Sequence, residues 1–260
     1  MFGTVIIDAY AKDDAEELAM AIDDLCSPND SYGWASAGIY SFWDYNTHEV
    51  LYIGLASDLA ERFKQHNGLI EMSENGCKRC QIEEYFKNHD KLGYTIFVQS
   101  PLSQPMVHRN RKQYEAFAAE KNTPVQEYVS DQGIEDIKRV EGILIQAFNL
   151  YYGHLPAWNR IGGSIEGQQR VLENNINIVK CFSNPQEYKA NPIVSRSTIR
   201  ELSNNVTYAA YEIDLHAVRM YMLMMGMNYQ DAFNVATMFD CYGSYNRISD
   251  SGYLNKRLVV

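Results

Sequence analysis

Two residues in the first third of this chain have the spacing that binding of a phosphate group requires. Arg62 and His66 lie four residues apart in a segment, 59–66, that Ser57 or Asp58 can cap as a helix. Residues one helical turn apart project from the same face. We therefore expect both side chains to reach one phosphate.

A carboxylate with an unusual setting lies in the middle of a helix predicted over residues 133–151. Apolar Ile137, Leu144 and Phe148 follow the helical repeat there and place Glu141 beside them, toward the buried side. A buried carboxylate is costly unless a cation or hydrogen bonds compensate its charge. A divalent metal ion bound by Glu141 would supply that compensation.

Two tripeptides occupy neighbouring predicted strands. Gly38-Ile39-Tyr40 and Tyr52-Ile53-Gly54 are separated by eleven residues, and the strands over 37–42 and 50–54 form a hairpin. Side chains alternate between the two faces of a strand, so each tripeptide presents its tyrosine and its glycine on one face of its strand.

The two tripeptides at this spacing resemble the signature of the GIY-YIG nuclease superfamily. The resemblance covers about residues 33–161 and includes an arginine ten residues after the second tyrosine and a histidine four residues later. It also includes a glutamate that resembles the metal-binding glutamate of the family and a late Pro-x-x-Asn. The residues that carry these further matches are Arg62, His66, Glu141 and Asn159.

The resemblance implies a metal-dependent endonuclease that hydrolyses phosphodiester bonds at a single Mg²⁺ or Mn²⁺ ion. Glu141 would bind the ion, and the ion and Arg62 would offset charge on the phosphate as water attacks in line. Asn159 would orient the site by hydrogen bonds. Many relatives have a polar residue or lysine where this chain has Leu55.

A tyrosine hydroxyl would activate the attacking water in this mechanism. Family members differ in which tyrosine does so, and we favour Tyr40 slightly over Tyr52, with His66 able to assist. A free tyrosine titrates near pH 10, so either residue needs a nearby cation or base to act at neutral pH.

The order of predicted elements indicates an α+β fold. We expect a small antiparallel or mixed three-stranded sheet flanked by helices, with the third strand over 94–99, and a mostly helical C-terminal region. Apolar residues at helical spacing predict two further helices over 208–225 and 232–239. We divide the chain into an acidic N-terminal segment (1–32), a nuclease domain (33–161) and the C-terminal region (162–260), which would serve target recognition or oligomerisation.

The charge balance is unusual for a protein that binds phosphates, because the formal net charge is −10. Residues 1–32 alone hold one lysine and eight acidic residues. Contacts with nucleic acid, DNA in preference to RNA, must therefore come from local basic clusters. The candidate nucleic-acid-binding residues are Lys78, Arg79, Arg109, Arg111 and Lys112.

Other interpretations remain open at this point. The acidic N-terminus could dock a protein partner on a retained nuclease fold, the enzyme could process RNA, and the chain could form a homodimer. A phage, restriction or mobile-element context fits by analogy of fold alone.

Localisation follows from what the sequence lacks. No run approaches the roughly 20 apolar residues that a bilayer span needs, and no secretory signal is visible. Five cysteines suit a reducing cytoplasm. Cys77 and Cys80 have the spacing of a zinc or redox pair but lack a second pair nearby, and we expect ordinary thiols.

Overall fold

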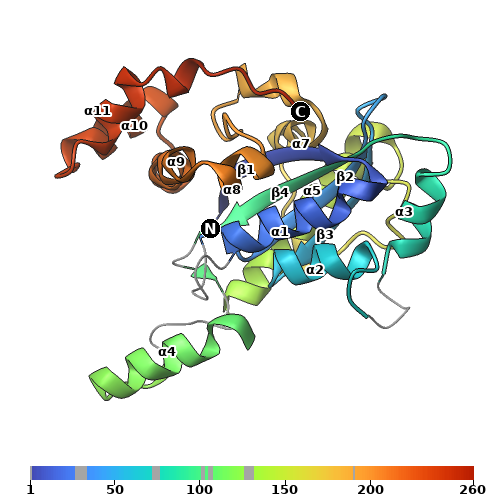
Figure 1. Ribbon diagram of the computed structural model, residues 1–260, viewed down its shortest axis with the longest axis horizontal. Coiled ribbons are helices and arrows are strands. Elements are labelled where there is room, and N and C mark those ends of the chain that lie inside the picture. The colour runs from blue at the N-terminus through green and yellow to red at the C-terminus, as the bar shows by residue number, and fades with distance from the viewer. Residues whose placement is uncertain are drawn as a thin grey trace.

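The centre of the molecule is one sheet of four strands in the order β1-β4-β2-β3, and all three pairings are antiparallel (Figure 1). In chain order the strands are β1 (Phe2–Tyr10), β2 (Gly38–Asp44), β3 (Val50–Ala56) and β4 (Leu92–Gln99). The α+β fold is thus confirmed, and the prediction of three strands is wrong by one. The run Phe2–Tyr10 is buried along its whole length, so it lacks the alternation that marks a half-exposed strand.

The helices vary widely in length: one follows β1, two lie between β3 and β4, and the rest follow β4. They are α1 (Ala15–Cys26), α2 (Leu59–His66), α3 (Arg79–Tyr85), α4 (His108–Lys121), α5 (Gln132–Tyr152), α6 (Ile165–Gln169), α7 (Ile176–Ser183), α8 (Ile199–Asn204), α9 (Val206–Met225), α10 (Tyr229–Met238) and α11 (Ser244–Asp250).

This computed structural model describes residues 2–26, 34–71, 77–100, 103–104, 108–125, 132–189 and 191–260. Within residues 108–113 it describes the side chain of Lys112 alone.

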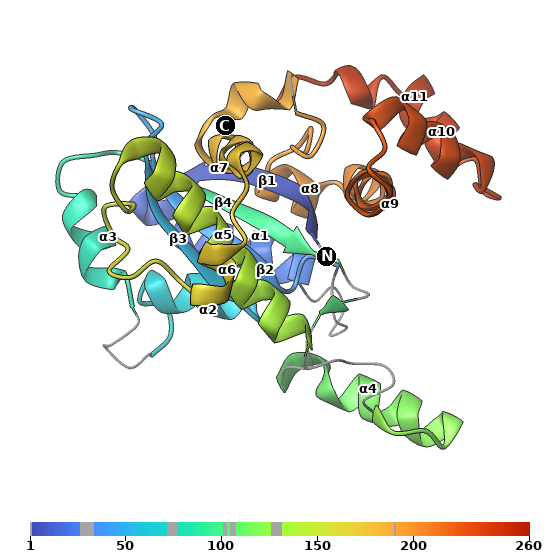
Figure 2. The same cartoon turned by 180° about the vertical axis from the view of Figure 1, so that it is seen from behind.

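Helices cover both faces of the sheet. Helices α1 and α2 pack on one face, where Leu18 and Phe63 join the sheet residues Ile6 and Phe42 in one core. Helices α5 and α7 cover the other face, as the reverse view shows (Figure 2). Full burial of each large apolar side chain stabilises the fold by about 1.5–3 kcal/mol. The sheet is therefore a rigid middle layer from which site residues can project.

The C-terminal region attaches at strand β1, the edge of the sheet far from β3. Val5 donates its N–H to Ile193 O at 2.9 Å and accepts from Ser195 N at 2.8 Å. A fully buried ion pair in α9 joins Arg219 and Glu212 at 2.7 Å. Helix α9 packs against β1, α10 and α11 lie farther from the sheet, and α4 projects separately from the body of the molecule (Figure 1). In the described part of the chain, no helix combines the length and apolarity that crossing a membrane requires.

Strand β1 and helix α1 form one core with the later strands, so residues 2–26 are built into the same layers as residues 38–99. The boundaries at 32/33 and 161/162 remain predictions.

Candidate active site

Strand pairing brings the two signature tyrosines together. Tyr40 lies opposite Gly54 and Tyr52 lies opposite Phe42, and the two tyrosine rings are 5.7 Å apart. A Cβ atom on Gly54 would lie 2.8 Å from each tyrosine hydroxyl and 2.5 Å from Tyr52 Cε1. Glycine is therefore required here because both hydroxyls occupy the space where a side chain would be.

His66 holds the Tyr40 hydroxyl from the last turn of α2. Its Nε2 lies 2.6 Å from Tyr40 Oη, and the backbone N–H of Lys78 donates to its Nδ1 at 3.0 Å. Burial, with the charges of Arg62 and Lys78, lowers the pKa of His66 to about 3, so the ring is neutral. Since Nδ1 accepts a hydrogen bond, the ring proton is on Nε2 and is donated to Tyr40.

The complete burial of His66 is at odds with the expectation that its side chain contacts a phosphate. The side chain has no accessible surface, so it does not reach a phosphate together with Arg62. Arg62 itself is half-buried on the preceding turn of α2. His66 instead holds the hydroxyl of Tyr40.

The two tyrosines differ in accessibility and in acidity. Tyr40 is 2% exposed, and burial raises its pKa well above 10. Tyr52 is half-buried, and burial also raises its pKa, whereas a hydrogen bond from Tyr40 lowers it. The nearby positive charge of Arg62 lowers the pKa of both hydroxyls. His66 thus donates a hydrogen bond to Tyr40, and Tyr40 donates one to the hydroxyl oxygen of Tyr52.

Lys78 lies inside the site, which corrects its assignment to a surface cluster. It is 8% exposed, and its Nζ donates to Trp158 O at 2.9 Å and lies 4.6 Å from the centre of the Tyr52 ring. Burial, with the charge of Arg160, lowers its pKa. Sequence reasoning missed this position because the groups that surround Lys78 are distant in the chain.

Arg79 and Lys112, the other predicted nucleic-acid-binding residues whose side chains the structure describes, do not join the site. Arg79 is exposed and forms an ion pair with Glu83 at 2.7 Å. Lys112 is exposed on the projecting helix α4, and the side chains of Arg109 and Arg111 lie outside the described residues. Their contact with nucleic acid stays a prediction.

Asn159 fixes the backbone of β3, an edge strand. Its Oδ1 accepts from Ile53 N at 2.9 Å, and its Nδ2 donates to Ile53 O at 2.8 Å. The neighbouring Trp158 N–H donates to Leu51 O at 2.8 Å. Asn159 thus forms hydrogen bonds with backbone groups that an edge strand would leave unpaired. These bonds fix the position of the strand that carries Tyr52.

Glu141 projects from α5 toward the same tyrosine. Burial raises the pKa of Glu141 to about 7, and its charge raises the pKa of Tyr52, so the two groups are neighbours. A Cβ atom built on Gly163 would lie 3.4 Å from Glu141 Oε2, and one on Gly142 would lie 2.5 Å from Ser164 O. The glycine-rich segment that reads as a boundary in the sequence therefore packs tightly against α5 beside the carboxylate.

The setting of Glu141 fits a divalent cation. Within the described ranges no side chain hydrogen-bonds to or forms an ion pair with this half-buried carboxylate, and burial alone accounts for its raised pKa. The same residues contain no group of three or more His, Cys, Asp or Glu side chains placed to hold a metal ion. An ion here would take one carboxylate from the protein and its remaining oxygen ligands from water and phosphate, as Mg²⁺ often does.

Comparison with known proteins identifies a domain in the first half of the chain, and the match ends before Glu141 and Asn159. A sequence model of the family described as GIY-YIG catalytic domain matches residues 36–128, which include Tyr40, Tyr52, Arg62 and His66. No curated protein and no solved structure matches the chain significantly. Residues 36–128, which hold the paired tyrosines and three of the four strands, thus match the catalytic domain of GIY-YIG nucleases.

Proposed function

We propose that this protein is a metal-dependent endonuclease that hydrolyses phosphodiester bonds in DNA. One observation carries the proposal: a pair of tyrosine hydroxyls, the cation Arg62 and the uncompensated carboxylate Glu141 converge at the β3 edge of the sheet. Phosphodiester hydrolysis needs these three components, which are a proton acceptor, a phosphate-binding cation and a metal ligand.

Glu141 would hold the metal ion, Mg²⁺ or Mn²⁺. When bound, the ion supplies positive charge that offsets the charge on the phosphoryl and leaving oxygens. Arg62 binds a second phosphate oxygen and orients the phosphorus for in-line attack.

Tyr52 is the group that accepts the proton of the attacking water. Although the sequence slightly favours Tyr40, the hydroxyl of Tyr40 is buried and donates to Tyr52. That hydrogen bond, Arg62 and the Lys78 ammonium over the Tyr52 ring all favour the phenolate form of Tyr52. Many relatives have a polar residue or lysine at the position of Leu55. In this chain Lys78 supplies the positive charge instead.

The reaction then follows from the residues present. Arg62 binds the phosphate, Tyr52 takes a proton from water, and the water oxygen forms a bond to phosphorus as the bond to the leaving oxygen breaks. The leaving oxygen, released as an alkoxide, takes up a proton from solvent water. The His66 ring keeps Tyr40 in the orientation in which its proton points at Tyr52.

The C-terminal region would supply target recognition or a homodimer contact, and exposed apolar residues on α9 and α10 offer a surface for the latter. Phage, restriction or mobile-element biology would suit such an enzyme.

Cleavage of end-labelled oligonucleotides tests the proposal. Single-stranded DNA, duplex DNA and RNA of one sequence are incubated with Mg²⁺, Mn²⁺ or EDTA and with wild type, Tyr52→Phe or Glu141→Ala protein. We expect metal-dependent cutting of DNA that both substitutions abolish. Cutting of RNA alone would identify an RNA-processing nuclease, and no cutting by folded wild type would favour a partner-docking module.

A further inference from the structure

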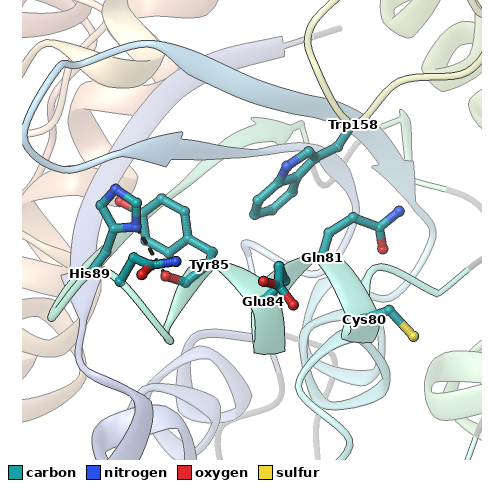
Figure 3. Close-up of a pocket in the computed structure, with 7 residues that line it drawn as sticks. Cys80, Gln81, Glu84, Tyr85, His89 and Trp158 are labelled. Carbon is teal, nitrogen blue, oxygen red and sulfur yellow. Dashed lines mark hydrogen bonds between the residues drawn. The ribbon is translucent and has the colours of Figure 1, made fainter.

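A pocket of about 540 Å³ lies between α3 and the segment that follows α5 (Figure 3). The Trp158 indole overhangs the pocket from one side, and α3 forms the other. The residues that line it are Cys80, Gln81, Glu84, Tyr85, Asn88, His89 and Trp158. The described surface here combines aromatic rings with neutral amides.

The aromatic walls are held in place from behind. Tyr85 and His89 stack with ring centres 4.1 Å apart and planes at 10°, and the His89 Nδ1 donates to Tyr85 O at 3.0 Å. The Tyr85 hydroxyl donates to Asp44 Oδ2 at 3.2 Å. Trp158 is fixed through its backbone, whose carbonyl accepts from Lys78 Nζ. A rigid aromatic platform loses little conformational entropy when a flat ligand stacks on it.

The polar groups at the rim favour a neutral ligand. The side-chain amides of Gln81 and Asn88 form no hydrogen bond within the described part of the chain, so each offers a donor and an acceptor. The one acidic side chain in the described lining, Glu84, already pairs with Lys87 at 2.5 Å. A carboxylate at the rim repels a phosphate, whereas it does not repel a nucleobase.

Two contacts connect the wall of the pocket to the proposed catalytic residues. Lys78 bridges them, because its Nζ binds Trp158 O and lies over the Tyr52 ring. Asn159, next in the chain after Trp158, clamps the strand that carries Tyr52. We therefore expect the base of a nucleotide adjoining the scissile phosphate to reach this platform.

We propose that this pocket binds one unpaired nucleobase of the substrate, stacked on Trp158 with its edge toward the amides of Gln81 and Asn88. The inference rests on the proposed nuclease function and adds a substrate class, namely DNA with an extrahelical or single-stranded nucleotide beside the cut. A base inside a duplex has both faces covered by its neighbours, so it has no free face for this stack. Stacking of a base on an aromatic side chain changes affinity by about 5- to 150-fold.

Binding to fluorescent DNA tests the inference. Glu141→Gln protein, which should bind without cutting, is titrated into a paired duplex and into the same duplex with a single bulged 2-aminopurine. We expect tighter binding to the bulged duplex, with quenching of 2-aminopurine as it stacks. Added Trp158→Leu should weaken binding to the bulged duplex about 5- to 150-fold and leave the paired duplex nearly unchanged.

Three further variants control for loss of fold. Trp158→Phe should retain most of the preference because it keeps an aromatic face. Gln81→Ala leaves the platform intact and should reduce the preference by a smaller factor. Tyr242→Leu, at a tyrosine 85% exposed on the loop between α10 and α11, should change nothing.

The outcomes separate this inference from the function on which it rests. Equal affinity for both duplexes, or equal loss for both in Trp158→Leu, would overturn the inference while wild-type cleavage of DNA upheld the nuclease. Failure to bind or cut any nucleic acid would overturn both.

Discussion

Replacing Glu141 by glutamine removes a charge that burial makes unfavourable. Burial raises the pKa of Glu141 from 4.5 to about 7, and each pKa unit corresponds to about 1.4 kcal/mol. The folded state holds this proton more tightly than the unfolded state, so the stability of the metal-free protein falls as pH rises from about 4.5 to about 7. Above pH 8 the ionised carboxylate costs about 3 kcal/mol.

Urea denaturation in EDTA from pH 4.5 to 8.5 measures this cost. The free energy of unfolding of Glu141→Gln, minus that of wild type, should rise by about 3 kcal/mol between pH 4.5 and about 8. Above about pH 8 the difference should stay level. The rise, and not the absolute difference, is the test, because the buried amide has its own pH-independent cost. Glu135→Gln is the matched control, since Glu135 lies on the same helix but is 56% exposed and paired with Lys138.

Binding of Mn²⁺ should restore part of the stability that ionisation of Glu141 removes from wild type. At pH 8, adding Mn²⁺ at ten times its dissociation constant should stabilise wild type by about 1.4 kcal/mol and leave Glu141→Gln unchanged. A pH-independent difference between the two proteins would refute the view that this carboxylate is buried without compensation. Equal stabilisation of both by Mn²⁺ would refute its role as the metal ligand.

Three further predictions concern the tyrosine pair and its support. Tyr52→Phe should lower kcat for DNA cleavage about 10³-fold, whereas Tyr40→Phe, which removes only a positioning hydroxyl, should lower it about tenfold; single-turnover kinetics measures both. Gly54→Ala places a methyl group 2.5 Å from Tyr52 Cε1 and should displace the hydroxyls, with about a 100-fold loss of activity in a protein whose circular dichroism is native. Asn159→Ala loses two hydrogen bonds to Ile53 and should lower the free energy of unfolding by about 2 kcal/mol in urea; an unchanged midpoint would contradict the clamp.

Local patterns in the sequence predicted much of this site. The helix over 59–66 was predicted from its cap, and the Asp58 side chain accepts from Glu61 N at 2.9 Å. The hairpin followed from β-branched and aromatic runs around a polar turn, and its register brings Tyr40 and Tyr52 together. These features depend on neighbours within a few residues, which is why they can be predicted from the chain alone.

Features set by distant contacts were missed. Strand β1 pairs with β4, more than eighty residues later, and its continuous burial hides the alternation of a strand. Lys78 resembled half of a surface cluster, but Trp158 and Tyr52 enclose it. Gly163 lies at the predicted domain boundary, although its lack of a side chain permits close packing beside Glu141. Composition alone does not distinguish a flexible glycine from a tightly packed one.

Metal-dependent cleavage is tested most directly by nicking of supercoiled plasmid DNA. Wild type, Glu141→Gln and Glu135→Gln proteins are compared over time in Mg²⁺, Mn²⁺ and EDTA, each after its fold is verified. We predict nicking or linearisation by wild type and Glu135→Gln with metal only, and none by Glu141→Gln. Cutting by Glu141→Gln at the wild-type rate, or by wild type in EDTA, would contradict a nuclease site built on this carboxylate.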